Sequence, residues 1–375
     1  MTRRRTAYPA FCGLSGHNVQ NMTKRHIALL LSAVALVGSG VAAAPPISVP
    51  KVRLVHSGQS IQKAVDAAQP GDTVLLMPGT YRQSVKIATP GVTLRGTGAE
   101  ATVLKPATGT NANDCGKRGN GICVAGTKNK RLKDVTVADL TVTGFSRAGV
   151  MAVGTDGLTV RNVSAVKNGL WGIAEERSKR SEYRANVARG NGDAGLFLAN
   201  TITAEQGALD TAGTVIAQNR LEDNRIGVTV RRLRDLTVAG NYVTANCTGV
   251  FVVGDENKPH AGALSVRDNL VTRNNKYCPK TARLPYLQGS GIVLTGAENT
   301  EVTGNTVLGN SGKSPLSGGI VLFKSFVGAA NERNRVSGNA LQDNSPADLV
   351  NQESTKRGNT FQQNSCHASK PAGLC

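Results

Sequence analysis

Pairs of asparagines recur along the chain with a fixed spacing of five residues. In "VTGNTVLGNSG" the pair is Asn305 and Asn310, with Val307 between them. The same spacing recurs at Asn186/Asn191, Asn219/Asn224, Asn241/Asn246, Asn269/Asn274, Asn339/Asn344 and Asn359/Asn364. Generic loop polarity does not explain a fixed offset, so we interpret each pair as part of an internal repeat.

The repeat predicts a solenoid. Aligned on Asn168 and on the second asparagine of each pair, the units recur about every 22 residues, and insertions lengthen some steps. Within a unit, valines alternate with polar residues in short runs between Asn and Gly turns, as in residues 236–252. Three short strands cannot bury an apolar face alone, so successive units must stack. Leucine-rich repeats need a dense leucine framework that is absent here, and the Gly/Asp-rich calcium-binding nonapeptide is absent too.

We therefore predict an all-β fold, a right-handed parallel β-helix. Its interior should receive Val238, Val243, Val250 and Val252 from one coil. Each asparagine is expected to take the left-handed conformation at a corner and to bond the equivalent asparagine one coil away. Aromatic residues are only 4% of the chain, which fits thin layers of small aliphatic side chains.

Residues 57–87 predict a cap for the first coil, whose sheet edge needs cover. Ser60 can N-cap a short helix with an apolar face of Ile61, Ala64, Val65 and Ala68. This segment resembles the opening of the pectin-lyase-like superfamily of right-handed β-helix proteins. The residues that carry the resemblance are Ile61-Gln62, Ala64, Ala67, Gly71-Asp72, Val74 and Gly79-Thr80-Tyr81. The resemblance covers nearly the whole mature chain and implies its fold.

Residues 1–44 have the pattern of a secretory signal peptide. Lys24 and Arg25 precede an apolar run, 27–37, that is too short to span a bilayer, and Ala42–Ala44 offer a small-residue cleavage site. A membrane anchor is the alternative interpretation. Met22 starts a complete signal by itself, so residues 1–21 are either a mis-assigned start or a long n-region. We expect a secreted monomer without a membrane span.

The rest of the chain is expected to form one domain with short ends. Residues 45–56 are predicted to be a linker, 57–365 the β-helix, and 366–375 a tail closed by a disulfide. Six cysteines remain after Cys12 is set aside, and an even number in an exported chain indicates disulfides. Pairing of sequence neighbours gives Cys115–Cys123, Cys247–Cys278 and Cys366–Cys375. A zinc site is disfavoured because no C-x2-C spacing occurs.

The mature chain is basic, with a net charge of about +14 by formal counting. Outside the cytoplasm, such a charge points to an anionic polysaccharide or cell-wall polymer as partner and not to nucleic acid. The alternative is that the charge only aids solubility.

In the superfamily that the chain resembles, ligands lie along the outer face of the strands that follow the second Asn turn. Alternation predicts two outward columns there. The first contains Met151, Ala174, Phe197, Thr229, Phe251, Val293 and Val321, and the second contains Val153, Glu176, Ala199, Arg231, Val253, Thr295 and Phe323. This face is apolar, so either insertions shelter it or it binds sugar rings or another apolar partner.

Charged residues flank these columns and give the candidate site. Arg231 and Glu176 are the candidate catalytic residues, for proton transfer or for clamping a carboxylate. The candidate substrate-binding residues are Arg232, Arg234, Phe197, Phe251, Asn200, Glu256, Lys258 and His260. A solvated loop rim is the alternative interpretation of these charges.

The catalytic patterns that the resemblance would bring are missing. The clustered aspartates of polygalacturonase-like hydrolases, the carboxylates that hold calcium in pectate lyases and the D-P-H-D motif of mannuronan epimerases are not found. No metal motif is present, and calcium enters only through the resemblance. Two hypotheses remain: an enzyme acting on an anionic polysaccharide, as a lyase, epimerase or hydrolase, or a non-catalytic glycan-binding scaffold.

Overall fold

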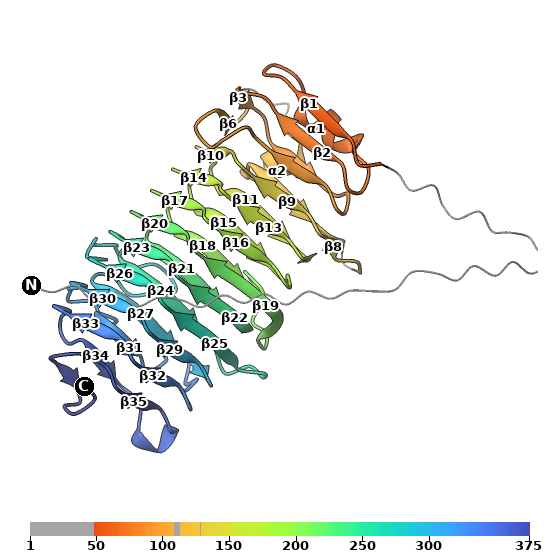
Figure 1. Ribbon diagram of the computed structural model, residues 1–375. Helices are drawn as coiled ribbons and strands as arrows, with labels where there is room; N and C mark the ends of the chain where they lie inside the picture. The colour runs from red at the N-terminus through yellow and green to blue at the C-terminus, as the bar shows by residue number, and fades with distance from the viewer. Residues whose placement is uncertain (1–48, 109–112, 128) are drawn as a thin grey trace, which may run out of the picture. The chain divides into compact units, whose positions relative to one another are not determined.

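The computed structural model describes residues 49–375, apart from 109–112 and 128. Short strands wind in turn through three parallel sheets, and each turn of the chain stacks on the one before it (Figure 1). The predicted all-β, right-handed parallel β-helix is confirmed. The expected signal peptide and its cleavage site lie outside the described residues.

The strands of the three sheets follow one another along the chain in the same order in nearly every coil. The first sheet contains β1 (Val52–Val55), β2 (Thr73–Leu76), β5 (Thr93–Arg95), β9 (Thr136–Ala138), β13 (Thr159–Arg161), β16 (Glu182–Arg184), β19 (Leu209–Ala217), β22 (Leu233–Ala239), β25 (Ala261–Arg267), β28 (Ala297–Glu298), β29 (Glu301–Thr303), β32 (Arg335–Ser337) and β35 (Thr360–Gln362). The second contains β3 (Gly79–Arg82), β6 (Thr102–Lys105), β10 (Thr141–Thr143), β14 (Ser164–Val166), β17 (Val187–Arg189), β20 (Arg220–Glu222), β23 (Tyr242–Thr244), β26 (Leu270–Thr272), β30 (Thr306–Leu308) and β33 (Ala340–Gln342).

The third sheet carries the site described below, and its strands from β11 to β27 have six residues each. It contains β4 (Val85–Ile87), β7 (Ile122–Ala125), β11 (Ala148–Val153), β15 (Trp171–Glu176), β18 (Ala194–Ala199), β21 (Ile226–Arg231), β24 (Thr248–Val253), β27 (Ser290–Thr295), β31 (Gly318–Leu322), β34 (Leu349–Asn351) and β36 (Ser369–Lys370). The remaining elements are the strand pair β8 (Leu132–Lys133) and β12 (Thr155–Asp156), the helices α1 (Ile61–Asp66) and α2 (Asp114–Lys117), and a 3-10 turn, η1 (Thr355–Arg357).

The interior of the coils is filled by aliphatic side chains that stack in columns. Val238, Val243, Val250 and Val252 are all fully buried, as alternation predicts. In the first sheet, Val238 pairs in register with its equivalents Ile216 and Val266 on the adjacent coils. Strands about 4.8 Å apart bring these side chains into contact, so small β-branched residues suffice to fill a thin core.

Two asparagine ladders form the corners on either side of the second sheet. Each side-chain amide donates to the Oδ1 atom of the asparagine one coil further on; for Asn246 and Asn274 the distance is 2.9 Å. The predicted ladder is therefore present, but the predicted backbone conformation is wrong. The left-handed residue is the one before each asparagine: Ala185, Gln218 and Ala245 have φ of 54°, 58° and 55°.

The last asparagine pair is out of register with the others. Asn359 accepts from Asn334, and Asn364 accepts from Asn339, so Asn364 continues the first ladder and not the second. Asp348 closes the second ladder instead, because its Oδ1 atom accepts from Asn344 at 2.9 Å. Burial opposes ionisation of Asp348, but hydrogen bonds from His367 and Asn344 outweigh it and lower the pKa of the carboxyl.

The two ends of the β-helix extend further than the predicted boundaries. Helix α1 is present, with Ser60 accepting from the Lys63 N–H at 3.2 Å and with Ile61 and Val65 buried in the core. Strand β1 already pairs with β2, so the stacked strands begin inside the segment predicted to be a linker. At the other end, β36 pairs with β34, which adds the predicted tail to the third sheet.

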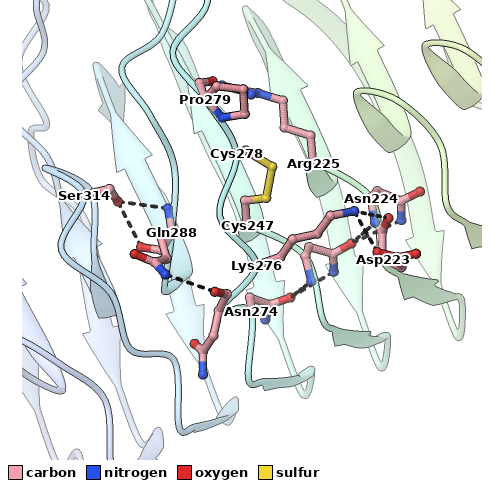
Figure 2. The surroundings of a disulfide bond; sticks show 12 residues. Asp223, Asn224, Arg225, Cys247, Asn274, Lys276, Cys278, Pro279, Gln288 and Ser314 are labelled. Carbon is pink, nitrogen blue, oxygen red and sulfur yellow. Dashed lines mark hydrogen bonds and ion pairs between the residues drawn. A yellow bond between two sulfur atoms is a disulfide. The ribbon is translucent and has the colours of Figure 1, made fainter.

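All three cysteine pairs join sequence neighbours, as predicted. Cys115 bonds Cys123, Cys247 bonds Cys278, and Cys366 bonds Cys375. Figure 2 shows the second of these at the corner before β24, beside Arg225 and Pro279. Arg225 donates to the Pro279 carbonyl at 2.8 Å, so the insertion after β26 is held to the coils by a disulfide and a hydrogen bond.

Candidate basic cleft

The outer face of the third sheet carries its own apolar cluster. Met151, Ala174 and Phe197 pair in register on β11, β15 and β18, and the column continues through Phe251 and Val293. Leu287 and Leu316, which lie in loops between strands, are buried against this column, and Ile202 and Leu284 pack at its margin. The insertions therefore shelter the face, and we call this group the outer cluster.

One end of this face is open and forms a cleft of about 620 Å³. Its floor includes Cys123, Met151 and Trp171 from β7, β11 and β15. One wall is the segment around α2, and the other contains Ile202 and Thr203. The latter two belong to residues 200–208, which connect β18 to β19 and are called the strap below.

The cleft is rich in positive charge. Lys117, Arg118, Arg147 and Arg177 line it, with Glu176 as the one carboxylate among its lining residues. Glu176 is half-buried, and its Oε1 atom accepts from the Ile202 N–H at 3.3 Å. The Arg147 guanidinium lies 5.8 Å from the centre of the Trp171 ring. Cations above an apolar and aromatic floor suit a sugar chain that carries negative charge.

A smaller cavity of about 390 Å³ adjoins the cleft, and both include Val153 and Arg177. Lys130 and Arg131 line it, and Arg131 donates to the Arg177 carbonyl. The positive surface therefore continues from the cleft towards β12. Arg177 has a φ of 53°, the left-handed conformation, as it turns the chain out of β15.

Two of the predicted arginines, Arg232 and Arg234, form ion pairs within the protein. The Arg232 side chain is 4% exposed and pairs with Asp255 and, at 3.8 Å, with Glu205. Arg234 pairs with Glu298 at 2.7 Å and also donates to the His260 carbonyl. Their charges are compensated within the protein, and their role as substrate-binding residues stays a prediction.

The predicted catalytic pair is not assembled in one cavity. Glu176, Ala199 and Arg231 pair in register, so two strand spacings separate Glu176 from Arg231. Between them lies the strap, whose Ile202 donates its N–H to Glu176 and accepts at its carbonyl from Arg231 at 3.1 Å. Burial, followed by the charges of Arg232 and Arg283, lowers the pKa of Arg231 to about 10.

The remaining predicted binding residues also lie apart from the cleft. Phe251 is 3% exposed, and Phe197 stacks on Trp171 with ring centres 4.7 Å apart, so neither ring offers a free face to a sugar. Asn200 donates to the Gly207 carbonyl within the strap, at 2.6 Å. Glu256, Lys258 and His260 follow β24 and do not line the cleft.

The sequence interpretation did not single out Lys117, Arg118 and Arg147, which line the cleft together with Arg177. Lys117 and Arg118 stand between the cysteines of the first disulfide, and Arg147 and Arg177 occupy the corners before β11 and after β15. The predicted pairing of Cys115 with Cys123 was the available signal for Lys117 and Arg118. This disulfide folds the residues between the two cysteines back onto β7.

No group of three or more His, Cys, Asp and Glu side chains in the described part of the chain is arranged to hold a metal ion. None of the helices within residues 49–375, gaps aside, has the length and apolar character needed to cross a bilayer.

Comparisons with known proteins agree with the fold. The family model "Right handed beta helix region" matches residues 91–262, and "Periplasmic copper-binding protein (NosD)" matches 199–371. No curated protein sequence matches the chain. The family-model match and the three stacked parallel sheets agree that the protein has the fold of a right-handed parallel β-helix.

Three solved structures illustrate that fold. The alginate lyase from Paenibacillus sp. str. FPU-7 is 15% identical, with 85% of this chain and 99% of that chain covered and a TM-score of 0.56. The Azotobacter vinelandii mannuronan C-5 epimerase AlgE6 A-module is 18% identical, with 82% and 90% covered and a TM-score of 0.52. The periplasmic alginate epimerase AlgG is 13% identical, with 83% of each chain covered and a TM-score of 0.50.

The copper named in the second family model does not fit this chain. Proteins bind copper mainly through His, Cys and Met side chains. Within residues 199–371 the histidines are His260 and His367, no methionine occurs, and the cysteines at 247, 278 and 366 are in disulfides. These donors do not assemble a copper site.

Proposed function

We propose that this protein binds an anionic polysaccharide in the cleft over β7, β11 and β15. The observation that carries the proposal is the lining: four cationic side chains and one carboxylate above a floor that includes Trp171. Arginine pairs with a carboxylate through two parallel hydrogen bonds, which suits uronic acid units. The names of the alginate lyase and the two epimerases that share the fold support a uronate-containing polymer.

Glu176 is the group in the cleft that could move a proton. Proton transfer at a uronate needs a side chain within hydrogen-bond reach and cations nearby to stabilise the negative charge that develops on the carboxylate. Arg177 adjoins Glu176 in the chain, and Arg147 lies on the preceding coil. An elimination or epimerisation fits this set better than hydrolysis, which uses two carboxylates.

Binding without catalysis is the second candidate function, and one observation favours it. Glu176 already accepts a hydrogen bond from the strap, and Arg231, the other candidate for proton transfer, lies beyond the strap. A glycan-binding scaffold needs only the cations and the apolar floor. Turnover decides between the two candidates.

The site of action is proposed to be outside the cytoplasm. Three disulfides are typical of proteins that fold in an oxidising compartment. The anionic polymers of cell walls and extracellular matrices are found there. A monomer is proposed, because a solenoid covers its own core without a partner.

Trp171 is the single tryptophan of the chain, so its fluorescence reports directly on the cleft. Titration with galacturonate and mannuronate oligosaccharides should change the emission, and the affinity should fall as salt rises. Arg177→Gln should weaken binding about tenfold, the effect of losing one charged hydrogen-bond pair. Arg335→Gln removes the same charge from the first sheet and should leave the affinity unchanged.

Activity is measured on the same oligosaccharides, as absorbance of unsaturated products and as new reducing ends. Loss of turnover in Glu176→Gln with binding retained would establish an enzyme. Binding without turnover would leave the scaffold function. Equal affinity for neutral and acidic oligosaccharides at all salt concentrations would contradict the proposal.

A further inference from the structure

Two arginines converge on one backbone oxygen at the inner end of the strap. Nη1 of Arg231 and Nη1 of Arg283 donate to the Ile202 carbonyl at 3.1 and 3.3 Å. Arg231 comes from β21, and Arg283 comes from the insertion between β26 and β27 that Cys247–Cys278 fastens. The two guanidinium groups are thus brought together from segments far apart in the sequence.

The charge of this pair is not compensated. Neither Arg231 nor Arg283 has a carboxylate within ion-pair distance in the described part of the chain. Asp255 and Glu205, whose charges act on Arg231, are paired with Arg232. A guanidinium has five N–H donors, whereas the Ile202 oxygen is a single neutral acceptor. Such a pair provides strong electrostatic attraction for an oxyanion.

The arginine pair lies in line with the cleft. Arg231 belongs to the same outward column as Val153 and Glu176, two strand spacings or about 10 Å beyond Glu176. Ile202 lies between the cleft and the arginine pair. It contributes to the lining of the cleft, and its carbonyl accepts from the arginines. A polymer lying across successive coils would pass from Arg147 and Arg177 to Arg231 if the strap moved aside.

We propose that Arg231 and Arg283 form a second oxyanion subsite, for a carboxylate or sulfate group further along the same polysaccharide. In the unliganded protein the strap closes this subsite, and the Ile202 carbonyl occupies the position of the anion. The inference rests on the proposed function, because the polymer must first occupy the cleft. A short oligosaccharide fills the cleft alone, whereas a long one displaces the strap.

The strap is held by hydrogen bonds and an ion pair, and we expect these to open without unfolding the coils. Arg232 donates to the Thr201 hydroxyl at 3.2 Å and pairs with Glu205, which is itself 70% exposed. At the ends, the Asn200 N–H donates to the Arg231 carbonyl at 3.1 Å and the Ala208 N–H to the Pro259 carbonyl at 2.7 Å. A long ligand binds only the molecules whose strap is open. Its apparent affinity is therefore the intrinsic affinity multiplied by the open fraction.

The test compares a disaccharide with an octasaccharide of the same uronate, using Trp171 fluorescence. Arg231→Gln and Arg283→Gln should each weaken the octasaccharide about tenfold and leave the disaccharide unchanged. Arg283 is exposed, so its variant tests the subsite even if Arg231→Gln unfolds. Thr201→Val removes a bond that holds the strap closed and should bind the octasaccharide more tightly. Arg335→Gln is the charge control.

Hydrogen exchange provides the second readout. Amides of residues 200–208 should exchange faster with the octasaccharide bound and not with the disaccharide. Equal losses for both lengths in Arg231→Gln and Arg283→Gln, or no loss for either, would overturn the second subsite. Octasaccharide binding without faster hydrogen exchange in residues 200–208 would also overturn the second subsite. If the disaccharide does not bind at all, or Arg177→Gln has no effect on it, the proposed function itself has failed.

Discussion

The outer faces of the second and third sheets differ although the same coils build both. Strands of the second sheet are mostly three residues long, and their outward side chains, such as Tyr242 and Thr244, are half-buried. The adjacent β24 of the third sheet has six residues, five of them buried. From β17 onwards, the second sheet begins at a tight asparagine corner in each coil, whereas the third sheet is flanked by loops of varied length.

The difference shows where the repeat leaves room for function. At the corner between the first and second sheets, the asparagine ladder keeps the same two-residue link from β16 to β33, so nothing is inserted there. The corners on either side of the third sheet accept insertions, and these supply the outer cluster, the strap and the walls of the cleft. Binding residues concentrate in loops that a rigid scaffold positions.

Removing an aromatic ring from each face should produce the largest contrast. Phe251→Ala empties a site in the outer cluster and should lower the free energy of unfolding by about 3–5 kcal/mol. Tyr242→Ala on the neighbouring strand loses a half-exposed ring that contacts Arg220 and should cost about 1 kcal/mol or less. Urea unfolding followed by far-UV circular dichroism measures both. Equal losses would show that the outer cluster is not a second core.

The fold was predictable because the same sequence pattern recurs in successive units. This pattern combines valine alternation with the five-residue asparagine spacing. A unit with a weak pattern can therefore be assigned from its neighbours. The exceptions occur where the repeat ends. Asn359 and Asn364 keep the five-residue spacing, but Asn364 joins the first ladder and not the second. Asp348 takes the last position of the second ladder.

The ladder between the second and third sheets provides the next test. In Asn246→Ala, the Asn224 N–H and the carbonyls of Leu221 and Thr244 lose buried hydrogen-bond partners. We expect a loss of about 2–4 kcal/mol, since unsatisfied buried polar groups cost about 1–3 kcal/mol each and partly relax. Asn129→Ala changes an exposed asparagine and is the control. Equal stability of the two variants would mean that the ladder is not a main source of stability.

The first disulfide should matter more for the cleft than for the coils. A bridge that closes so short a loop contributes about 2 kcal/mol. Cys115→Ser with Cys123→Ser should lower stability by that amount and also weaken oligosaccharide binding, because Lys117 and Arg118 lose their anchor. Cys366→Ser with Cys375→Ser removes a bridge of similar loop length far from the cleft and should leave the affinity unchanged. The same loss of affinity in both double variants would show that the first disulfide has no specific role in positioning the cleft residues.

The site was only partly predictable, and the reason is physical. Alternation placed Glu176 and Arg231 correctly in one outward column, since the period of a strand is fixed. It could not show that the strap separates them or that Asp255 neutralises Arg232, because those contacts come from insertions without a period. Phe197 and Phe251 were correctly placed outward, yet the same insertions bury them.

The smallest expected effect concerns a carboxyl on the opposite, inward face of the third sheet. Glu175 lies between Ala152 and Leu198 in an interior column and accepts from the hydroxyls of Ser181 and Tyr183. Burial raises the pKa of Glu175 above its usual value, although these hydrogen bonds and Arg131 act in the opposite direction. Because the folded-state pKa is the higher one, the contribution of this carboxyl to stability is complete below the unfolded pKa. It is lost as pH rises through the folded pKa.

Glu175→Gln removes this pH dependence and keeps an acceptor for the two hydroxyls. The stability of the variant relative to the native protein should therefore improve as pH rises from about 4 to about 7. Urea unfolding at a series of pH values measures the difference, and Glu301→Gln, an exposed glutamate on the first sheet, supplies the reference profile. A difference that stays constant with pH, or one that moves against the variant, would mean that Glu175 ionises in the folded protein as easily as in the unfolded chain. The interior of the coils would then tolerate charge as the cleft outside does, and the contrast between the two faces of β15 would disappear.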